Sequence, residues 1–333
     1  MIQANKKHTQ KVPLVAIHCL VYNHEPYLRD CFEGFVMQQT NFPFVAIVHD
    51  DASTDNSVEI IREYESKYPH IFKPIYQTKN QYSNPEVSVD CIVNAAIQQI
   101  GAKYIALCEG DDYWTDPLKL QKQVDFLEEN PEYSFCCHRF NILKDKEQKF
   151  IHEYGYNLYV PEQDLIINEE VFFKAWVTQW LTTVVRTDLF VEVCKIAKNT
   201  FNRCLDVYIY FLLLQRGNGI SLNQSMGIYR WISTGASIGR TDVQCLQEGY
   251  SIGKNLYKVF PQKVQAKNRM KYYGIRLLGY CNLCNKIDRR FYKDNIHLLD
   301  SPKEQILAFL LFIIPPFIWK FTRHIYSSFL FKD

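Results

Sequence analysis

The chain has 333 residues, of which 47% are hydrophobic, so it is long enough and apolar enough to bury a substantial core. Its formal charge of +2 gives no electrostatic basis for binding nucleic acid, and no nucleic-acid partner is expected. The 11 cysteines are odd in number and lack scaffold-like spacing, which favours reduced thiols over a disulfide framework. These properties argue against a nucleic-acid-binding protein and a disulfide-stabilised scaffold, so the function must be inferred from the motifs.

Predicted strands alternate with predicted helices along the first third of the chain. The apolar run 15–21 predicts a strand, and the spacing of apolar residues in 28–36 predicts a helix. The runs 45–48 and 104–107 predict further strands, and a helix is expected over 58–67. Polar residues follow each strand directly. Because open parallel α/β sheets bind ligands beyond the carboxyl ends of their strands, a ligand site is expected there.

Three carboxylates stand together after the strand at 104–107, namely Glu109, Asp111 and Asp112. Adjacent like charges repel each other and are costly to desolvate, so a positive partner is expected among them. Sites rich in carboxylate oxygens suit Mg²⁺ or Mn²⁺, and these ions commonly hold phosphates. The alternative interpretation is a solvated acidic turn, because Gly-Asp is ordinary turn chemistry.

A second acidic segment, residues 50–55, follows the strand at 45–48 in the same layout. Ser53, Thr54 or Asp55 is in position to cap the helix that comes next. Asp51 and Asp111 are about sixty residues apart, which leaves room for two strand–helix units of about 30 residues each. A strand run, Phe72–Tyr76, lies between them and is followed by Lys79 and Asn80.

Residues 13–140 resemble the nucleotide-sugar domain of family 2 glycosyltransferases. The resemblance rests on four segments in the family's order, which are residues 21–23, 50–55, 109–112 and 114–123. It implies the GT-A fold, an α/β architecture in which helices flank a Rossmann-like, mixed and mostly parallel sheet. A helical extension is expected after this domain.

The resemblance also implies a nucleotide-sugar donor, with uridine as the family's default base, and it assigns roles in the donor site. Asp50 would accept a hydrogen bond from the base, and Glu109 would take the first position of the family's Asp-x-Asp motif, facing the ribose. Asp111 and Asp112 would hold Mn²⁺ or Mg²⁺ on the diphosphate, and which of them binds the ion directly stays open. The other donor-site candidates are Tyr22, Asn23, Glu25, Asp51, Lys79 and Arg230. For Lys79, a merely solvated side chain is the alternative.

An inverting transferase also needs a base on the acceptor side, because the acceptor hydroxyl loses its proton as it displaces the nucleoside diphosphate. Asp206 is similar in position to the family's base-bearing Asp at the start of a helix, and a helix N-cap is its alternative role. The family's fuller Gln-x-x-Arg-Trp motif is absent, so processive polymerisation is not expected. The predicted acceptor residues are Trp114, Gln179, Trp180 and Trp231, with a core position as the alternative for Trp114.

The chain is expected to divide into four parts. These are a polar tail (1–12), a GT-A domain (13–240), a helical extension (241–302) and a hydrophobic and basic tail (303–333). Within the domain, 13–140 would form the nucleotide-sugar half and 141–240 the acceptor half.

The apolar run 306–319 in the last part is too short to span a membrane. As a helix, its 14 residues would reach about 21 Å, against a hydrocarbon core of about 30 Å. Basic residues follow it, so the run is expected to dip into one leaflet, and burial against the protein is the alternative. The polar first residues resemble no signal peptide. The protein is therefore expected in the cytoplasm, peripheral on the inner face of the cytoplasmic membrane.

Taken together, these features predict a metal-dependent inverting glycosyltransferase of hexosyl or N-acetylhexosaminyl type. It would move a sugar from a UDP-sugar to a glycan or lipid-linked glycan in surface polysaccharide synthesis. Two other classes stay open. A sugar-phosphate nucleotidyltransferase would carry a Gly-rich, basic loop where residues 22–25 stand. A non-catalytic, membrane-associated glycan-binding protein would have no need for the acidic cluster or for Asp206.

Overall fold

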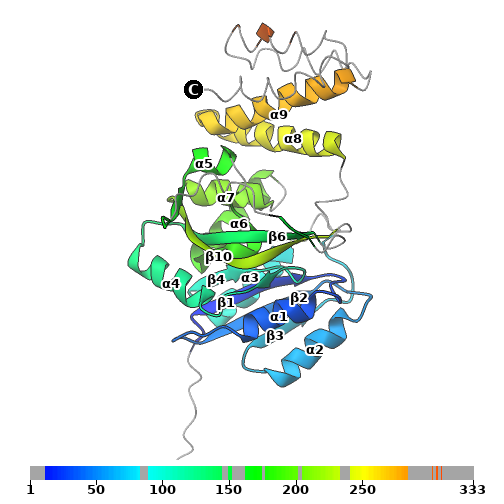
Figure 1. Ribbon diagram of the computed structural model, residues 1–333, viewed down its shortest axis with the longest axis vertical. Helices are drawn as coiled ribbons and strands as arrows, with labels where there is room; N and C mark the ends of the chain where they lie inside the picture. The colour runs from blue at the N-terminus through cyan, green and yellow to red at the C-terminus, as the bar shows by residue number, and fades with distance from the viewer. Residues whose placement is uncertain are drawn as a thin grey trace, which may run out of the picture. The chain divides into compact units, whose positions relative to one another are not determined.

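A computed structural model of the chain describes most of the sequence in seven stretches. They are residues 12–82, 89–144, 149–151, 162–174, 177–201, 205–232 and 241–283, together with 302, 305, 306 and 309. The chain forms two compact units, Met1–Ser233 and Thr234–Asp333, whose elements are labelled in Figure 1.

A single mixed β-sheet is the centre of the first unit (Figure 1). Its strands are β1 (Val15–Val21), β2 (Phe44–Asp50), β3 (Phe72–Tyr76), β4 (Tyr104–Leu107), β5 (Tyr113–Trp114), β6 (Phe135–Lys144), β7 (Lys149–Ile151), β8 (Leu165–Ile167), β9 (Val184–Arg186) and β10 (Gly219–Trp231). The strand order is β3-β2-β1-β4-β9-β6-β10-β5, with β7 beside β6 and β8 beside β10. Strands β1 to β4 pair in parallel, as do β6 and β10, and β9 joins these two groups in the antiparallel sense. The predicted mixed and mostly parallel sheet is confirmed.

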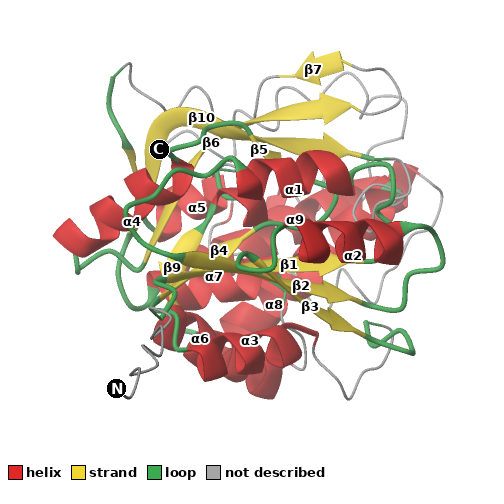
Figure 2. Ribbon diagram, turned by 90° about the horizontal axis from the view of Figure 1, so that it is seen from below, coloured by secondary structure: helices red, strands yellow, loops and turns green. Residues whose placement is uncertain are grey.

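Helices cover both faces of this sheet (Figure 2). On one face lie α1 (Leu28–Val36) and α2 (Ser57–Lys67), and on the other lie α3 (Val89–Ile100) and α6 (Thr187–Phe201). The unit also contains α4 (Lys119–Glu129), α5 (Glu169–Lys174), the short 3₁₀ helix η3 (Trp180–Thr182) and α7 (Asp206–Leu214). Because both faces are covered, the central strands read as continuous apolar runs rather than as alternating ones.

The apolar spacing in α1 explains how that helix attaches to the sheet. Leu28, Cys31, Phe32 and Phe35 recur at helical intervals and are fully buried. The ring of Phe32 packs edge-on against Phe72 of β3, with 4.9 Å between the centroids. Such aromatic contacts add to the free energy gained by burying the rings.

The start of α2 differs from the predicted cap. The N-cap residue is Asn56 rather than Ser53, Thr54 or Asp55, and its own side chain makes no capping hydrogen bond. Asp55 still contributes, because its Oδ1 accepts a hydrogen bond from the backbone N–H of Ser57 at 3.0 Å. The side chains of this segment are instead used to bind the neighbouring loop.

Lys119, the first residue of α4, is completely buried. Its Nζ lies 3.8 Å from the centroid of the Trp114 ring and has no hydrogen-bond partner among the described residues. Burial lowers the pKa of Lys119 to about 7, while the nearby thiols of Cys108, Cys136 and Cys137 act in the opposite direction. The fold therefore carries a cost at this position that depends on pH.

Replacing Lys119 by methionine is expected to raise the free energy of unfolding at pH 7, with an upper bound of about 5 kcal/mol. The folded pKa lies below the ordinary value of 10.5, so the unfolded state binds more protons between pH 7 and 10.5. The stability of the unmodified protein therefore rises across this window, and its deficit relative to the methionine variant should shrink. Urea unfolding of both proteins at pH 7, 8.5 and 10 measures this, and a pH-independent difference would contradict it.

The second unit contains α8 (Asp242–Val259) and α9 (Val264–Leu283), which pack against each other. Thr241 caps α8 through a reciprocal pair of hydrogen bonds with Gln244. A Cβ at Gly253 would lie only 2.6 Å from the backbone of Met270, so glycine permits the close approach of the two helices.

Two of the predicted parts fall largely outside the described residues. These are the N-terminal tail 1–12 and the C-terminal tail 303–333, apart from residues 12, 305, 306 and 309. Within the described stretches, no helix is both long enough and apolar enough to cross a membrane.

Candidate active site

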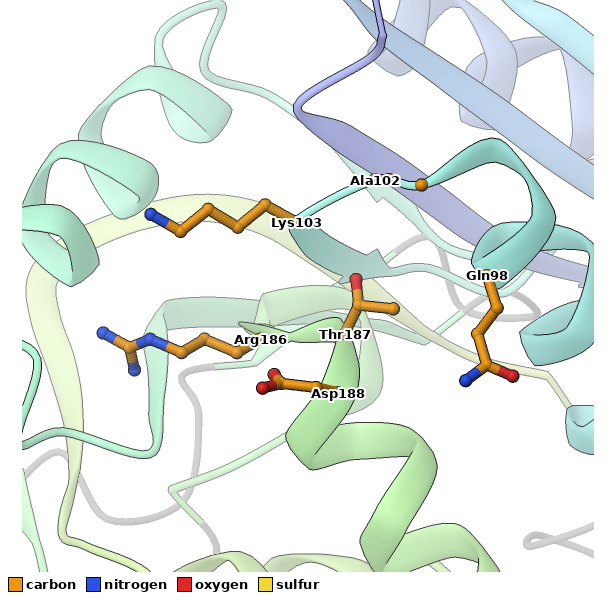
Figure 3. Close-up of a pocket in the computed structure, with 7 residues that line it drawn as sticks. Gln98, Ala102, Lys103, Arg186, Thr187 and Asp188 are labelled. Atoms are coloured by element: carbon orange, nitrogen blue, oxygen red, sulfur yellow. The ribbon is translucent and has the colours of Figure 1, made fainter.

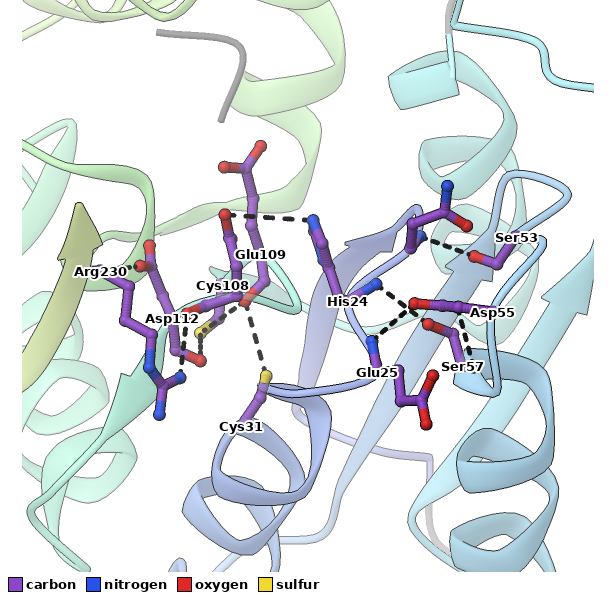
Figure 4. A network of polar contacts seen from close by, with 12 residues as sticks. His24, Glu25, Cys31, Ser53, Asp55, Ser57, Cys108, Glu109, Asp112 and Arg230 are labelled. Carbon is purple, nitrogen blue, oxygen red and sulfur yellow. Dashed lines mark hydrogen bonds and ion pairs between the residues drawn. The ribbon is translucent and has the colours of Figure 1, made fainter. Parts of the chain in front are cut away.

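The loops that follow β1 and β2 are bound together by side-chain-to-backbone hydrogen bonds (Figure 4). Asn23 Oδ1 accepts from the N–H of Thr54 at 2.7 Å, and the Asn23 N–H donates to Ser53 Oγ at 3.0 Å. The carboxylate of Glu25 accepts from both the backbone N–H and the side chain of Asn56, at 3.1 and 2.6 Å. Asn23 and Glu25 therefore fix the shape of this rim.

Both loops contain a non-glycine residue in the left-handed backbone region. The φ angles are 56° at Asn23 and 62° at Ala52. Asparagine tolerates this conformation, but for alanine it costs about 1–2 kcal/mol. Strained residues persist where the surrounding structure holds them, and they cluster at ligand sites. The two residues mark the rim as a candidate binding surface.

Asp50, the last residue of β2, presents an unused acceptor. Its side chain is 1% exposed, and Oδ2 accepts from the N–H of Ser53 at 3.2 Å. Oδ1 is buried and has no hydrogen-bond partner among the described residues. A buried carboxylate oxygen without a donor is costly, so this atom is suited to receive an N–H from a bound base.

Asp51 differs from its neighbour, because both of its oxygens already accept hydrogen bonds. Oδ1 accepts from the N–H of Gln81 at 2.7 Å, and Oδ2 accepts from the N–H of Tyr82 at 2.9 Å. Asp51 thus holds the loop after β3, which also carries the exposed Lys79. Tyr22, at the end of β1, is 46% exposed and has a free ring surface at the same edge of the sheet.

The acidic cluster lies just past the end of β4, and its members differ in their surroundings. Asp112 is 1% exposed and its Oδ1 accepts from the N–H of Arg230 at 2.8 Å. Burial, followed by the charge of Asp111, raises the pKa of Asp112 well above its ordinary value. Asp111 is more open, and its buried Oδ1 has no partner among the described residues. Asp111 therefore offers the free ligand atom, and Asp112 anchors the turn.

Glu109 is the third carboxylate of this cluster. Burial raises the pKa of Glu109 to about 8. The negative charges that add to this rise belong to Asp111, Asp90 and Asp206. The site thus concentrates acids from α3, α7 and the loop after β4, and such a group favours a bound cation.

His24 is a site residue that the sequence analysis missed. Its Nε2 lies 4.0 Å from Asp111 Oδ2, and its Nδ1 is buried without a partner among the described residues. A Cβ at Gly110 would lie 2.8 Å from this Nδ1, so only glycine fits there. The sequence did contain a signal for His24, because this residue stands inside the polar segment that follows β1.

Arg230 does not occupy the position expected for a residue that contacts the diphosphate. Its guanidinium is 5% exposed, forms an ion pair with Asp30 and donates to the carbonyl of Asp111 at 3.0 Å. It also lies over the rings of Tyr27 and Tyr113, at 5.2 and 4.4 Å from their centroids. Figure 4 shows the side chain pointing away from the Glu109 carboxylate. Arg230 fixes the acidic turn from behind.

Trp114 likewise takes the alternative role considered for it. The side chain is 2% exposed, its ring packs on Phe35, and its Nε1–H donates to the carbonyl of Leu181 at 2.8 Å. A Cβ at Gly34 would lie 3.0 Å from the Trp114 backbone, so α1 and β5 are in close contact. An indole enclosed in this way has no face left for stacking on an acceptor sugar.

The other predicted acceptor residues are more accessible. Trp180 is half-buried at the start of η3, with its ring centroid 5.7 Å from that of Tyr210. Gln179 precedes it and caps the short helix. Trp231, at the end of β10, is also half-buried, and Lys144 Nζ lies 5.8 Å from its ring centroid.

Asp206 is exposed at the first position of α7, and the N-cap residue is Leu205. Its Oδ1 accepts a short hydrogen bond, 2.7 Å, from the N–H of Val207. Its charge helps to raise the pKa of both Glu109 and Tyr229, which places it within electrostatic range of the acidic cluster. The structure thus brings together acids that are nearly a hundred residues apart in the chain.

A pocket of about 350 Å³ lies at the opposite end of β4 (Figure 3). It is lined by basic side chains, but these already have partners. Lys103 pairs with Glu128 at 2.7 Å, and Arg186 donates to the carbonyls of Tyr133 and Leu127 at 2.6 and 2.7 Å. Both basic side chains of this pocket are therefore engaged, and the carboxyl edge of the sheet is the stronger candidate.

Among the described residues, no three His, Cys, Asp or Glu side chains are arranged as a ready-made metal site. The absence of such a group is compatible with Mg²⁺ or Mn²⁺, because ions at phosphate-transfer sites are often held by one or two carboxylates, substrate phosphates and water. The unpaired Oδ1 of Asp111 is a suitable hard donor atom for such an ion.

Comparison with known proteins defines the family. Residues 17–183 match the profile of Glycosyl transferase family 2. TuaG of Bacillus subtilis (strain 168), named for teichuronic acid biosynthesis, is 31% identical over 228 residues, 68% of this chain and 82% of TuaG. Protein Rv1520 of Mycobacterium tuberculosis (strain ATCC 25618 / H37Rv) is 41% identical over 135 residues, 40% of this chain. The chain spans only 37% of the length of Rv1520.

Solved structures agree with this assignment at the level of the fold. The S. aureus TarS fragment 1–349 in complex with UDP has a TM-score of 0.60 at 13% identity, covering 94% of this chain and 91% of that one. The mannosyltransferase PcManGT from Pyrobaculum calidifontis, in complex with GDP-Man and Mn²⁺, has a TM-score of 0.50 at 12% identity, covering 93% and 87%. The expected GT-A fold is confirmed, and the chain belongs to glycosyl transferase family 2.

Proposed function

We propose that this chain is a metal-dependent inverting glycosyltransferase that moves a sugar from a UDP-sugar to a hydroxyl group of a glycan acceptor. The observation that carries the proposal is that the carboxyl ends of β2 and β4 bring their acids to one edge of the sheet. The end of β2 supplies the unpaired Asp50 Oδ1, and the loop after β4 supplies the unpaired Asp111 Oδ1 and the half-buried Glu109. Family membership supports the same activity.

The donor is a nucleoside diphosphate sugar of hexosyl or N-acetylhexosaminyl type. Asp50 accepts an N–H from the base, and Tyr22 offers an exposed ring beside it. Uridine is supported by TarS, whose structures hold UDP and UDP-GlcNAc. Lys79, exposed on the loop that Asp51 holds, is able to approach a phosphate.

The metal is Mn²⁺ or Mg²⁺, with Asp111 as the direct ligand and Asp112 as the residue that fixes the turn. Support comes from the free oxygen of Asp111 and from PcManGT, whose structure holds Mn²⁺. When bound, the ion stabilises the negative charge that develops on the leaving diphosphate. Arg230 helps indirectly, because it binds the carbonyl of Asp111 and keeps the turn in place.

Asp206 is the general base. It removes the proton from the acceptor hydroxyl while that oxygen attacks the anomeric carbon and the nucleoside diphosphate leaves. Positioned bases of this kind contribute about 10²–10⁴-fold to the rate. Gln179, Trp180 and Trp231 form the acceptor wall, since their partly exposed side chains can contact a sugar ring.

A thermal-shift titration with UDP, UDP-glucose and UDP-GlcNAc, each with and without Mn²⁺, tests the donor class. A ligand that binds only the folded protein raises its apparent stability, so a UDP-sugar with Mn²⁺ should raise the Tm most. Sugar phosphates with UTP are the matching test for a nucleotidyltransferase. A larger shift with that pair would contradict transfer from a UDP-sugar.

The acceptor is a surface glycan or its lipid-linked precursor, and the protein works on the inner face of the cytoplasmic membrane. TuaG, a relative named for teichuronic acid biosynthesis, supports a polysaccharide acceptor. Helices α8 and α9 with their connection, residues 242–283, carry seven basic and two acidic side chains, a net charge of +5. Lys271 is buried, and the remaining basic side chains suit anionic headgroups, at about 1 kcal/mol per basic residue near the membrane.

Deletion of residues 303–333 is expected to release the protein from vesicles that contain anionic phospholipid. The apolar run 306–319 supplies insertion, and α8 and α9 supply a weaker, salt-sensitive attraction. Flotation with anionic and with purely zwitterionic vesicles, at 0.1 and 0.5 M salt, separates the two contributions. Equal flotation of the full chain and the truncated chain would show that the tail packs on the protein instead.

A further inference from the structure

Asp90 and the buried His18 form a pair near the carboxylate cluster. Asp90 lies in the first turn of α3, and His18 lies in the middle of β1. His18 Nε2 is 3.7 Å from Asp90 Oδ1, a distance that allows an electrostatic contact but is longer than a hydrogen bond. The His18 side chain is 2% exposed and that of Asp90 is 18% exposed.

The pair is joined directly to the segment that carries the acids. His18 stands opposite Leu107 in the parallel pairing of β1 with β4, and its carbonyl accepts from the N–H of Cys108 at 3.1 Å. The next residue is Glu109, and the charge of Asp90 contributes to the raised pKa of Glu109. Asp90 therefore lies within electrostatic range of Glu109. It belongs to α3, which covers the face of the sheet opposite to α1.

One ring nitrogen of this pair is unused in the described part of the protein. His18 Nε2 has no hydrogen-bond partner among the described residues. Its ring is held edge-on by Phe190, with 6.3 Å between the centroids, so it has a fixed orientation. Burial lowers the pKa of His18 to about 4 and raises that of Asp90 to about 6. A partly buried carboxylate beside a neutral imidazole is stabilised further when a ligand supplies hydrogen-bond donors.

The chemistry of the surroundings indicates which donors fit. Glu109, Asp111 and Asp206 already contribute negative charge here, which disfavours an anionic ligand. Neutral hydroxyl groups satisfy carboxylate oxygens without adding charge. A sugar bound between the metal side, at Asp111, and the base side, at Asp206, would present hydroxyl groups to the Asp90 carboxylate.

We propose that Asp90, oriented by His18, accepts hydrogen bonds from hydroxyl groups of the transferred sugar and so determines which donor sugar is bound. The proposal rests on the proposed transferase function. Asp90 contacts the substrate, and His18 is a positioning residue. The nucleotide part of the donor lies on the other loops and does not depend on either residue.

The experiment compares the affinities of UDP, UDP-glucose and UDP-GlcNAc by calorimetry with Mn²⁺, in the unmodified protein and in Asp90→Ala. The affinity for UDP should stay within about twofold, because a remote site is unaffected. The affinity for the preferred UDP-sugar should fall by about 10- to 100-fold, the effect of losing hydrogen bonds to a charged group. His18→Leu should give a smaller loss in the same direction.

Asp188→Ala is the matched control, because Asp188 also lies in the first turn of a helix, α6, but lines the pocket at the far end of β4. It should change none of the three affinities. Asp90→Asn, which keeps the shape of the side chain, gives the same comparison if the alanine variant is unstable. Equal losses for UDP and UDP-sugar, or no loss for either, would overturn the assignment of Asp90. Failure of the unmodified protein to bind UDP would instead overturn the proposed function.

Discussion

Asp206→Asn should lower the rate of sugar transfer by about 10²–10⁴-fold while leaving the affinity for the UDP-sugar and Mn²⁺ within about twofold. The asparagine keeps the shape of the side chain but cannot take the proton of the acceptor hydroxyl. Asp206 is exposed at the start of α7 and lies within electrostatic range of Glu109, so its loss does not disturb the core. Transfer rates and calorimetric donor affinity measure the two effects separately.

Asp188 provides a close control for this substitution. Both residues lie in the first turn of a helix, and both accept a hydrogen bond from the next backbone N–H, at 2.7 Å for Asp206 and 2.8 Å for Asp188. Asp188→Asn should therefore reproduce any effect on helix stability without the loss of rate. Normal turnover in Asp206→Asn would show that another group serves as base.

Asp111→Asn is expected to abolish the gain in UDP affinity that Mn²⁺ provides. Asp111 has an unpaired carboxylate oxygen at the site, whereas Asp112 is engaged by the backbone of Arg230. A carboxylate bridge to the ion is worth several kcal/mol, so the Mn²⁺-dependent part of the affinity should fall at least 100-fold. Calorimetry with and without Mn²⁺ measures this difference.

Asp112→Asn tests whether Asp112 binds the ion directly or only holds the acidic turn in place. The asparagine oxygen can still accept the hydrogen bond that holds the backbone of β10 against the acidic turn, and the unfavourable buried charge is removed, so both the Tm and the effect of Mn²⁺ should be retained. Asp125→Asn, an exposed position on α4, is the neutral control. If Asp112→Asn removes the effect of Mn²⁺ and Asp111→Asn does not, the two assignments must be exchanged.

The nucleotide half of the fold could be predicted because its strands are buried on both faces. Apolar runs mark β1 and β4 to the residue, and β2 is longer than predicted only at its ends. β3 was also predicted to the residue, although it lies at the edge of the sheet and Lys73 is exposed. The acceptor half gave no such signal. β10 runs from Gly219 to Trp231 but carries polar, exposed residues around Gln224 and two shifts of register against β6. Irregular pairing of this kind breaks the period-2 pattern on which strand prediction depends.

The site was predictable where it follows strands and unpredictable where it depends on packing. The acids at 50, 109, 111 and 112 could be placed because each follows a recognisable strand. Arg230 was assigned from its charge and from the family resemblance, and sequence could not indicate that Asp30, Tyr27 and Tyr113 enclose it. Asp90 was missed because it follows no predicted strand, and only the fold brings α3 near the carboxylates.

The most direct test of the account is a crystal of the full chain soaked with UDP and Mn²⁺, with anomalous diffraction recorded at the manganese edge. The account predicts one strong peak between the Asp111 carboxylate and the diphosphate of UDP, with the uracil at Asp50. UDP bound at this edge of the sheet without a manganese peak, or a peak away from Asp111, would contradict it.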